Sequence, residues 1–446
     1  MMNTSTHSVS SRALWRVGFL GVCFLILVYA VIVLRMETIY RERKNDGWKT
    51  YTKENSPLSD NQINAVITDK KGQIWIATHS GLNVLSTDGT WTVYKEENST
   101  LYDDDIQALT IDQTGRIWVG TYSGGLYVID RTGQWINYIG RDNNRLGTSV
   151  QALAVDRLGR VWVGTNRGLS VFDVNNVETI YTEDNSGLEN NRVVALAVDP
   201  LDRIWIATES RTINVLDQEG NWTTYDENSD NSLNRVLSFQ IDDQGQVWIG
   251  TDLGINVLTL DGNWIYPQSP WESSLSSIYV DAFAVDRQER LWVGTFQELF
   301  VVDSDGNQIL YAPANSGLLG WVLTLTVDDD DQLWIGTSNG LNRIALDNLP
   351  KPVADDWLRL RNTIRAPLDF LLAIIRTVFF PGASIFAPCY IPLLLLILVS
   401  PIVALISRAR GKTELAYRSM IVFFVSITGA VIIWVLLIFL IISAGD

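Results

Sequence analysis

The chain has 446 residues, of which 47% are hydrophobic, and its net charge is −16. Residues 45–350 hold 19 basic and 43 acidic residues, a net of −24, whereas the flanks are basic. Such an acidic central region would repel phosphate backbones, so nucleic acid is not an expected partner. The two cysteines, Cys23 and Cys389, lie in apolar runs, which excludes a disulfide or a thiolate metal site from the central region.

The first predicted element is a membrane-spanning helix at residues 17–34. This run is uncharged, and it is long enough to cross about 30 Å of hydrocarbon. A cleaved signal peptide is the competing interpretation, but the charged and bulky residues from Arg35 to Lys44 do not resemble a cleavage site. Residues 1–47 are therefore expected to form an uncleaved anchor and a basic juxtamembrane segment.

Between the flanks, one unit recurs seven times. A tetrad of Trp, Ile or Val, Gly or Ala, and Thr begins at Trp75, Trp118, Trp162, Trp205, Trp248, Trp292 and Trp334. A period of about 40–45 residues with several short strands is typical of a propeller blade. The third unit shows four strands, at residues 150–156, 160–165, 169–174 and 177–182. The repeated Trp is expected to pack between blades, and the small residue two positions later to leave room for an adjacent ring.

The ends of the repeat indicate how the ring closes. An outer-strand motif, Trp-x-x-Tyr in its fuller form, occurs at Trp48, Trp91, Trp135 and Trp222, and its tyrosine recurs at Tyr181, Tyr266 and Tyr311. The last unit has inner strands at 322–327, 333–337 and 341–346, with no outer strand after them. The strand at 48–52 is therefore expected to complete the seventh blade, which removes the exposed edges of an open ring. The predicted fold class is an all-β seven-bladed propeller of four-stranded blades over residues 48–346, plus transmembrane α-helices.

After the propeller, residues 347–388 are expected to form a linker with an amphipathic or re-entrant helix. Residues 389–446 are expected to form a transmembrane hairpin with spans at about 389–407 and 420–442. The loop between these spans is basic and therefore cytoplasmic. Two interpretations of 366–388 stay open. As an interfacial segment it leaves three spans and an external propeller, and as a fourth span it places the propeller in the cytoplasm.

Loops on one face of the predicted propeller are candidates for binding. Residues that vary between units at the ends of the inner strands are free to serve a ligand. After the tetrad threonines these are His79, Tyr122, Asn166, Glu209, Asp252, Phe296 and Ser338. Before the inner strands they are Gln62, Asp105, Ser149, Arg192, Arg235, Tyr279 and Trp321. The aromatic side chains could stack on a sugar, and the arginines could bind its hydroxyls or acidic groups.

Catalytic chemistry has little support in the sequence. Propeller enzymes need a His, a carboxylate pair or a metal cluster at the channel mouth, and only His79 qualifies. The acidic clusters Asp103–Asp105 and Asp328–Asp331 lack the spacing of a calcium loop and are expected to be solvated turns. No catalytic residue, metal or cofactor is therefore predicted.

The run WTVYKEENSTLYDDDIQALTIDQTGRIWVGTYSGGLYVID (91–130) resembles the two-component regulator propeller repeat. The resemblance covers about residues 48–346, although units four and six depart from the Gly-Leu pair that the repeat carries after its tetrad, with Thr212 at the glycine position in unit four and Glu298 before Leu299 in unit six. It implies a bacterial, extracytoplasmic, ligand-sensing propeller, which in known members feeds a kinase and often responds to glycans. No kinase segment follows here, so a signal would pass to a separate partner.

These observations predict a multi-pass membrane protein whose propeller is a sensor or recognition module outside the cytoplasm. Its ligand, a glycan or a protein, would bind at the rim, and its partner would be reached through the membrane helices. The first alternative is a cytoplasmic-facing, membrane-tethered interaction scaffold, which the basic residues after the first span favour. The second is a lyase-like propeller enzyme that depends on His79.

Overall fold

The computed structural model describes residues 31, 33–42, 44–139, 148–226, 234–242, 244–259, 261–265, 279–303, 305, 307–350 and 352. The chain divides into two compact units. Residues 44–352 form the first unit, and residues 1–43 together with 353–446 form the second. The propeller lies in the first unit.

Of the second unit, residues 33–42 are described and are helical, with Thr38 Oγ1 donating to the Leu34 carbonyl at 2.8 Å. No helix within the described ranges is both long enough and apolar enough to cross a membrane. The predicted spans at 389–407 and 420–442 and the stretch 366–388 lie outside the described residues. So does the predicted span at 17–34, apart from residues 31, 33 and 34.

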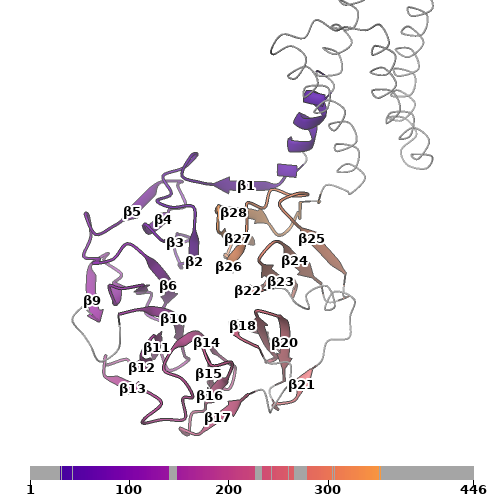
Figure 1. The fold of residues 1–446 in the computed structure, drawn as a ribbon. Helices are drawn as coiled ribbons and strands as arrows, with labels where there is room; N and C mark the ends of the chain where they lie inside the picture. The colour runs from indigo at the N-terminus through magenta and orange to yellow at the C-terminus, as the bar shows by residue number, and fades with distance from the viewer. Residues whose placement is uncertain are drawn as a thin grey trace, which may run out of the picture. The chain divides into compact units, whose positions relative to one another are not determined.

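In the part of the chain that the structure describes, twenty-eight strands form seven separate four-stranded antiparallel sheets, arranged as blades around a central axis (Figure 1). Blade 1 comprises β2(Ile63–Thr68), β3(Ile74–Thr78), β4(Gly81–Leu85) and β5(Trp91–Tyr94); blade 2 comprises β6(Ile106–Ile111), β7(Ile117–Thr121), β8(Leu126–Ile129) and β9(Trp135–Ile139). Blade 3 comprises β10(Val150–Val155), β11(Val161–Thr165), β12(Gly168–Phe172) and β13(Glu178–Tyr181); blade 4 comprises β14(Val193–Val198), β15(Ile204–Thr208), β16(Ile213–Leu216) and β17(Trp222–Tyr225). Blade 5 comprises β18(Val236–Ile241), β19(Val247–Thr251), β20(Gly254–Leu258) and β21(Trp264–Ile265); blade 6 comprises β22(Val280–Val285), β23(Leu291–Thr295), β24(Leu299–Val302) and β25(Gln308–Tyr311). The predicted propeller fold is confirmed.

Blade 7 joins the two ends of the propeller. It comprises β26(Val322–Val327), β27(Gln332–Thr337), β28(Gly340–Ala345) and, as its outer strand, β1(Trp48–Tyr51). β1 pairs antiparallel with β28, with Trp48 opposite Ile344 and Tyr51 opposite Leu341. The predicted closure by the N-terminal strand is therefore confirmed, and β28 has no free edge.

Every tetrad tryptophan is bonded to an aspartate six residues earlier in the chain. In all seven blades the indole Nε1 donates to an Asp Oδ2 at 2.7–3.1 Å, from Asp69, Asp112, Asp156, Asp199, Asp242, Asp286 and Asp328. The other carboxylate oxygen accepts backbone amides of the turn between the first and second strands, as in Asp286 with Gln288 and Arg290. One side chain thus closes the turn and orients the large core ring. Asp328, expected to be merely a solvated turn residue, has this role in blade 7.

The outer strands form a belt of aromatic rings between blades. Tyr51 stacks on Trp334 of its own blade at 6.0 Å and meets Trp91 of blade 1 edge-on at 5.6 Å. The same arrangement recurs at Tyr181 and Tyr225, each between its own tetrad Trp and the next outer-strand Trp. Aromatic pairs of this kind contribute about 0.5–1.5 kcal/mol beyond burial of their area. Tyr266 lies outside the described residues.

Four of the five tetrad glycines have a different neighbour from the one expected. A Cβ added to Gly164 would lie 2.6 Å from Cγ1 of Val193, and one added to Gly336 would lie 2.7 Å from Cγ2 of Ile63. Val193 and Ile63 are the first residues of the next blade's inner strand. The prediction of an adjacent ring was therefore wrong for Gly120, Gly164, Gly294 and Gly336, because a β-branched side chain from the first strand of the next blade fills the space beside each of them. It is confirmed at Gly250, where an added Cβ would lie 3.0 Å from Cε2 of Phe283 on the next blade.

Candidate functional site: the rim

The connections within each blade lie at two ends of the propeller. Because the strands are antiparallel, the turns after the first and third strands share one end, which we call the turn face. The loops after the second strand and the links to the next blade share the other end, which we call the rim. All the predicted binding residues belong to the rim.

The threonine that ends each tetrad shapes the rim loop that follows it. In six blades its Oγ1 donates to a backbone carbonyl three or four residues later, at 2.8–3.0 Å, as in Thr165 with Gly168 and Thr295 with Glu298. Blade 4 lacks the glycine and uses a cluster of hydroxyls from Thr208, Ser210 and Thr212 instead. These bonds explain why the threonine is constant while the next residue varies.

The two predicted sets of rim residues lie side by side. In six blades the amide of the residue after the threonine donates to the carbonyl of the residue before the inner strand, at 2.9–3.3 Å. The pairs are Tyr122–Asp105, Asn166–Ser149, Glu209–Arg192, Asp252–Arg235, Phe296–Tyr279 and Ser338–Trp321. In blade 1 the contact is between side chains, because Gln62 Nε2 lies 3.0 Å from His79 Nε2. The backbone thus displays two varied side chains per blade in a repeated geometry.

Three predicted aromatic residues gather on blades 6 and 7, and we call Tyr279, Phe296 and Trp321 the aromatic sector. The Phe296 and Trp321 ring centroids are 3.9 Å apart, and those of Tyr279 and Phe296 are 6.4 Å apart. Tyr279 and Trp321 remain 50% and 47% exposed, so their rings are available to a ligand. Tyr122 is 57% exposed but lies on blade 2, outside this sector.

The charged rim residues are partly engaged with one another. Arg192 and Glu209 form an ion pair at 3.2 Å, with 46% and 44% of their side chains exposed. Arg235 and Asp252 are joined through the backbone, and Oδ1 of Asp252 is buried without a hydrogen-bond partner. The charges of blade 4 therefore already satisfy each other, whereas blade 5 holds a buried carboxylate oxygen that has no hydrogen-bond partner.

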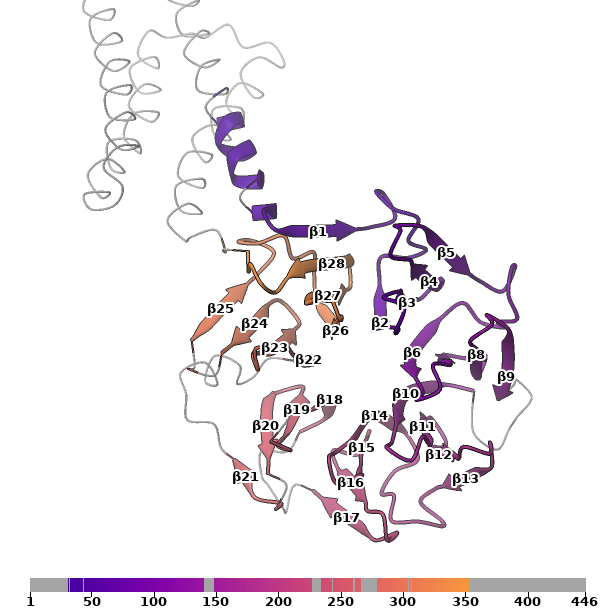
Figure 2. The same cartoon turned by 180° about the vertical axis from the view of Figure 1, so that it is seen from behind.

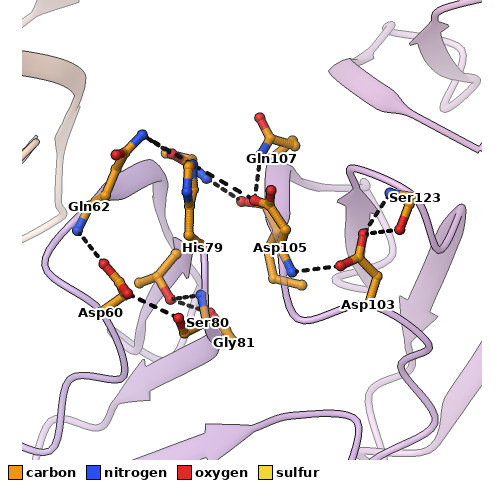
Figure 3. Close-up of polar contacts among 12 residues, drawn as sticks. Asp60, Gln62, His79, Ser80, Gly81, Asp103, Asp105, Gln107 and Ser123 are labelled. Carbon is orange, nitrogen blue, oxygen red and sulfur yellow. Dashed lines mark hydrogen bonds and ion pairs between the residues drawn. The ribbon is translucent and has the colours of Figure 1, made fainter.

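His79 belongs to a polar cluster that spans blades 1 and 2 (Figure 3). Its Nε2 lies 3.8 Å from Asp105 Oδ1, and Gln107 Nε2 donates to the same oxygen. Asp60 accepts a hydrogen bond from Ser80 at 2.9 Å, and Asp103 accepts one from Ser123 Oγ at 2.8 Å. Burial raises the pKa of Asp105, and the charge of His79 partly offsets this effect. The acidic cluster Asp103–Asp105 thus takes part in rim contacts between blades.

A second ring of residues, just inside the rim, was missed from the sequence. The ladder of every inner strand shifts register after its first residue, so the second residue is left unpaired as a bulge. These residues are Asn64, Gln107, Gln151, Val194, Leu237, Asp281 and Leu323. The available signal, present in four of the seven blades, was a polar residue at the second position of the inner strand.

Asp281 is the unusual member of this bulge ring. Burial raises the pKa of its carboxyl from 3.8 to about 6, and Arg235 on the preceding blade only partly opposes the shift. A carboxyl group that is costly to ionise in the free protein would gain from a ligand that brings a hydrogen-bond donor or a positive charge.

The Asp281→Asn variant is expected to change how stability depends on pH. Between about pH 4 and pH 6 the native state holds a proton at Asp281 that the unfolded state releases, because its native pKa is raised from 3.8 to about 6. Asp281 therefore makes the free energy of unfolding decrease as the pH rises through this window, and its effect is constant above it. Urea denaturation at pH 4, 5, 6 and 7 should show that decrease reduced in the variant. Equal pH slopes in the two proteins would contradict the raised pKa.

Among the described residues, no three His, Cys, Asp or Glu side chains come together in an arrangement that could hold a metal ion. The described rim residues instead offer ring faces, carboxylates and amide groups. Such a surface suits recognition of an organic ligand or a protein.

The sequence profile of the two component regulator propeller matches residues 57–80, 144–167, 187–210 and 232–252. The predicted resemblance to this repeat is therefore confirmed in these four segments of the propeller. No curated protein matches the chain in sequence.

Solved structures share the fold at low sequence identity. The extracellular domain assigned to a hybrid two component system, BT3049 of B. thetaiotaomicron, is 21% identical, with a TM-score of 0.59 over 68% of this chain and 41% of that one. Virginiamycin B lyase from Staphylococcus aureus is 13% identical, with a TM-score of 0.54 over 67% and 99% of the two chains. PorZ, a surface component of the type-IX secretion system of Porphyromonas gingivalis, is 17% identical, with a TM-score of 0.51 over 64% and 46%. The chain spans about two fifths of the length of the BT3049 extracellular domain. These similarities establish the fold alone.

Proposed function

We propose that the propeller, four segments of which match the two component regulator propeller, is the recognition module of a membrane-anchored sensor. The module binds a ligand at the rim and passes the signal to a separate partner protein. The observation that carries this proposal is the constant loop scaffold, which displays varied side chains that include the exposed aromatic sector. A purely structural rim would have no need to leave Tyr279 and Trp321 half exposed.

The chemistry of the rim favours an oligosaccharide as the ligand. Ring faces on blades 6 and 7 suit the apolar faces of sugar rings, and the next blade along the ring supplies amide and imidazole groups from Gln62 and His79. Hydrogen bonds from such groups would set specificity, while stacking would supply much of the affinity.

Binding of oligosaccharides is expected to depend on Trp321. The full-length protein in detergent would be titrated with neutral and with uronic-acid-containing oligosaccharides, and binding would be followed calorimetrically. Trp321→Ala should weaken binding about tenfold, because the loss of about 1.4 kcal/mol of aromatic contact raises Kd by that factor. Tyr122→Ala, which removes an exposed rim aromatic outside the aromatic sector, is the matched control and should change Kd little. Binding that is equally strong in both variants would rule out the aromatic sector as the site.

The propeller is proposed to lie outside the cytoplasm, because the structurally similar BT3049 domain is named as an extracellular domain. Ser210, exposed in the rim loop of blade 4, provides the test. With Ser210→Cys, a membrane-impermeant maleimide should label intact cells, since Cys23 and Cys389 lie in predicted spans. Labelling only after lysis would favour the alternative, a cytoplasmic interaction scaffold, and would make 366–388 a fourth span. The unsubstituted chain is the control for background labelling.

We also propose that His79 has a binding role and not a catalytic one. Its Nε2 is held between Gln62 at 3.0 Å and Asp105 at 3.8 Å, in a network that already joins two blades. The partner protein, reached through the predicted membrane helices, would carry any enzymatic output of the sensor.

A further inference from the structure

Four aliphatic side chains are exposed together on the turn face, opposite the rim. Leu158, Val174, Val177 and Leu201 are 59%, 65%, 60% and 55% exposed, and we call them the apolar corner. They come from the two turns of blade 3 and the first turn of blade 4. Across the part of the propeller that the structure describes, the other large exposed hydrophobic residues lie on outer strands or toward the rim.

The turns that carry the apolar corner are held against one another. A Cβ added to Gly159 would lie 3.4 Å from Cγ1 of Val174, so the two turns of blade 3 are in contact. Arg157 links blade 3 to blade 4, because its amide donates to Asp202 Oδ1 at 3.0 Å and its Nη1 donates to the Pro200 carbonyl at 2.6 Å. The four side chains therefore project from one fixed surface.

The repeat shows that the fold does not require apolar residues in these turns. At the position of Leu158 and Leu201, the other five blades carry Lys71, Thr114, Gln244, Gln288 and Asp330. At the position of Val177, five other blades carry Thr90, Gln134, Asn221, Asn263 and Asn307. Polar turns in other blades, such as those at Asp286 and Asp217, keep the same aspartate-to-amide bonds. The neighbouring blades 3 and 4 thus carry apolar side chains at turn positions where the other blades carry the polar residues named above.

Both ends of the propeller unit leave it at this same turn face, from blade 7. β1 begins at Trp48 opposite Ile344, near the end of β28, and the Leu346 amide donates to the Asp331 carbonyl in the first turn of that blade at 2.9 Å. A Cβ added to Gly47 would lie 3.1 Å from Cβ of Pro350, so the entering and leaving chains are adjacent. Blades 3 and 4 lie across the ring from β1 and β28 (Figures 1 and 2).

We propose that the apolar corner docks on the surface of the phospholipid bilayer in which the chain is anchored. It is a second point of contact, across the propeller from the two connections to the predicted membrane segments. The inference rests on the membrane anchoring proposed above. With the apolar corner docked, the turn face is oriented toward lipid. The rim then remains accessible to ligands on the side away from the bilayer.

The size and composition of the apolar corner favour lipid over a protein partner. A stable protein interface buries about 800 Å² per partner from some 20–30 residues, many more than four side chains. Binding hot spots in such interfaces are rich in Trp, Tyr and Arg, and Leu and Val are under-represented. A tethered domain, in contrast, meets its own bilayer at a high effective concentration, so a weak aliphatic contact is sufficient. Acidic neighbours such as Asp173 and Glu219 make attraction to anionic lipid an unsuitable driving force.

The test places a fluorescent probe at the apolar corner of the full-length chain. A Cys23→Ser, Cys389→Ser background would carry Val177→Cys labelled with an environment-sensitive fluorophore, in phosphatidylcholine nanodiscs that contain nitroxide-labelled lipid. Leu253→Cys, at a rim position that is 53% exposed, is the matched control. Quenching at residue 177 should be at least about threefold stronger than at residue 253, because side chains that enter the headgroup boundary reach a depth of about 5–10 Å. It should persist at high salt, and Leu201→Cys should behave like Val177→Cys.

Other outcomes separate the two proposals. Equal quenching at residues 177 and 253 in a chain that inserts into the nanodiscs would overturn docking at the apolar corner and leave the anchored sensor intact. A chain that does not insert would overturn both. Emission at residue 177 that shifts with protein concentration in detergent, without lipid quenching, would assign the surface to a second copy of the chain and overturn the lipid assignment.

Discussion

Replacing Tyr51 with alanine is expected to lower the free energy of unfolding by about 3–5 kcal/mol, as other truncations of buried aromatic residues do. Only 9% of Tyr51 is exposed. Its ring stacks on Trp334 within blade 7 and meets Trp91 of blade 1 edge-on. It also lies on β1, the strand that closes the propeller. The variant is therefore expected to weaken the junction between the two ends of the propeller.

Tyr225→Ala is the matched control for this prediction. Tyr225 has the same two ring contacts, with Trp205 at 6.0 Å and Trp264 at 6.0 Å, but lies in a blade whose four strands are consecutive in sequence. Both variants should lose stability in urea denaturation followed by tryptophan fluorescence. Only Tyr51→Ala should also associate as its concentration rises, because release of β1 exposes the edge of β28. A Tyr51→Ala protein that stays monomeric by light scattering would show that β1 is not a vulnerable closure.

The Asp286→Ala variant is expected to lose about 3–5 kcal/mol of stability, because it leaves a largely buried arginine without its partner. Asp286 Oδ2 accepts hydrogen bonds from Arg290 Nε at 2.6 Å and from Trp292 Nε1 at 2.8 Å. Only 11% of the Arg290 side chain is exposed. The two turn amides bonded to Oδ1 would also lose their acceptor. Urea denaturation of the full-length protein in detergent measures the loss.

The corresponding variant in blade 7, Asp328→Ala, distinguishes the contribution of the arginine charge from that of the turn hydrogen bonds. Asp328 bonds its tryptophan at 2.7 Å and the turn amides of Asp330 and Gln332, and Gln332 stands where blade 6 has Arg290. The arginine of blade 7, Arg343, lies over the Trp334 ring, 5.6 Å from its centroid. Asp328→Ala should therefore be clearly less destabilising than Asp286→Ala. If the two losses are equal, the arginine contributes nothing measurable and the hydrogen bonds of the turn account for the whole effect.

The amino-acid sequence by itself determined the number of blades, the four-stranded pattern and the closing strand. These features are local, because the strands and turns recur every 42–44 residues and each tetrad marks one blade. The positions of the rim residues also followed from the sequence, since a loop between two strands of known direction can face only one end of the propeller. The predicted roles of these residues in binding remain predictions.

Only the tertiary structure decided which residues meet across blades. Val193 fills the space beside Gly164, and Trp321 joins Phe296 at the rim, although each pair spans two blades. Such contacts depend on how adjacent sheets are offset around the ring, which no local period encodes. The apolar corner depends on the same information, whereas the bulge at Asp281 is set by the pairing of β22 with β23 within one sheet. The sequence shows that Leu158 and Leu201 are apolar where other blades are polar, and the fold brings them to one surface across the ring from the two chain connections.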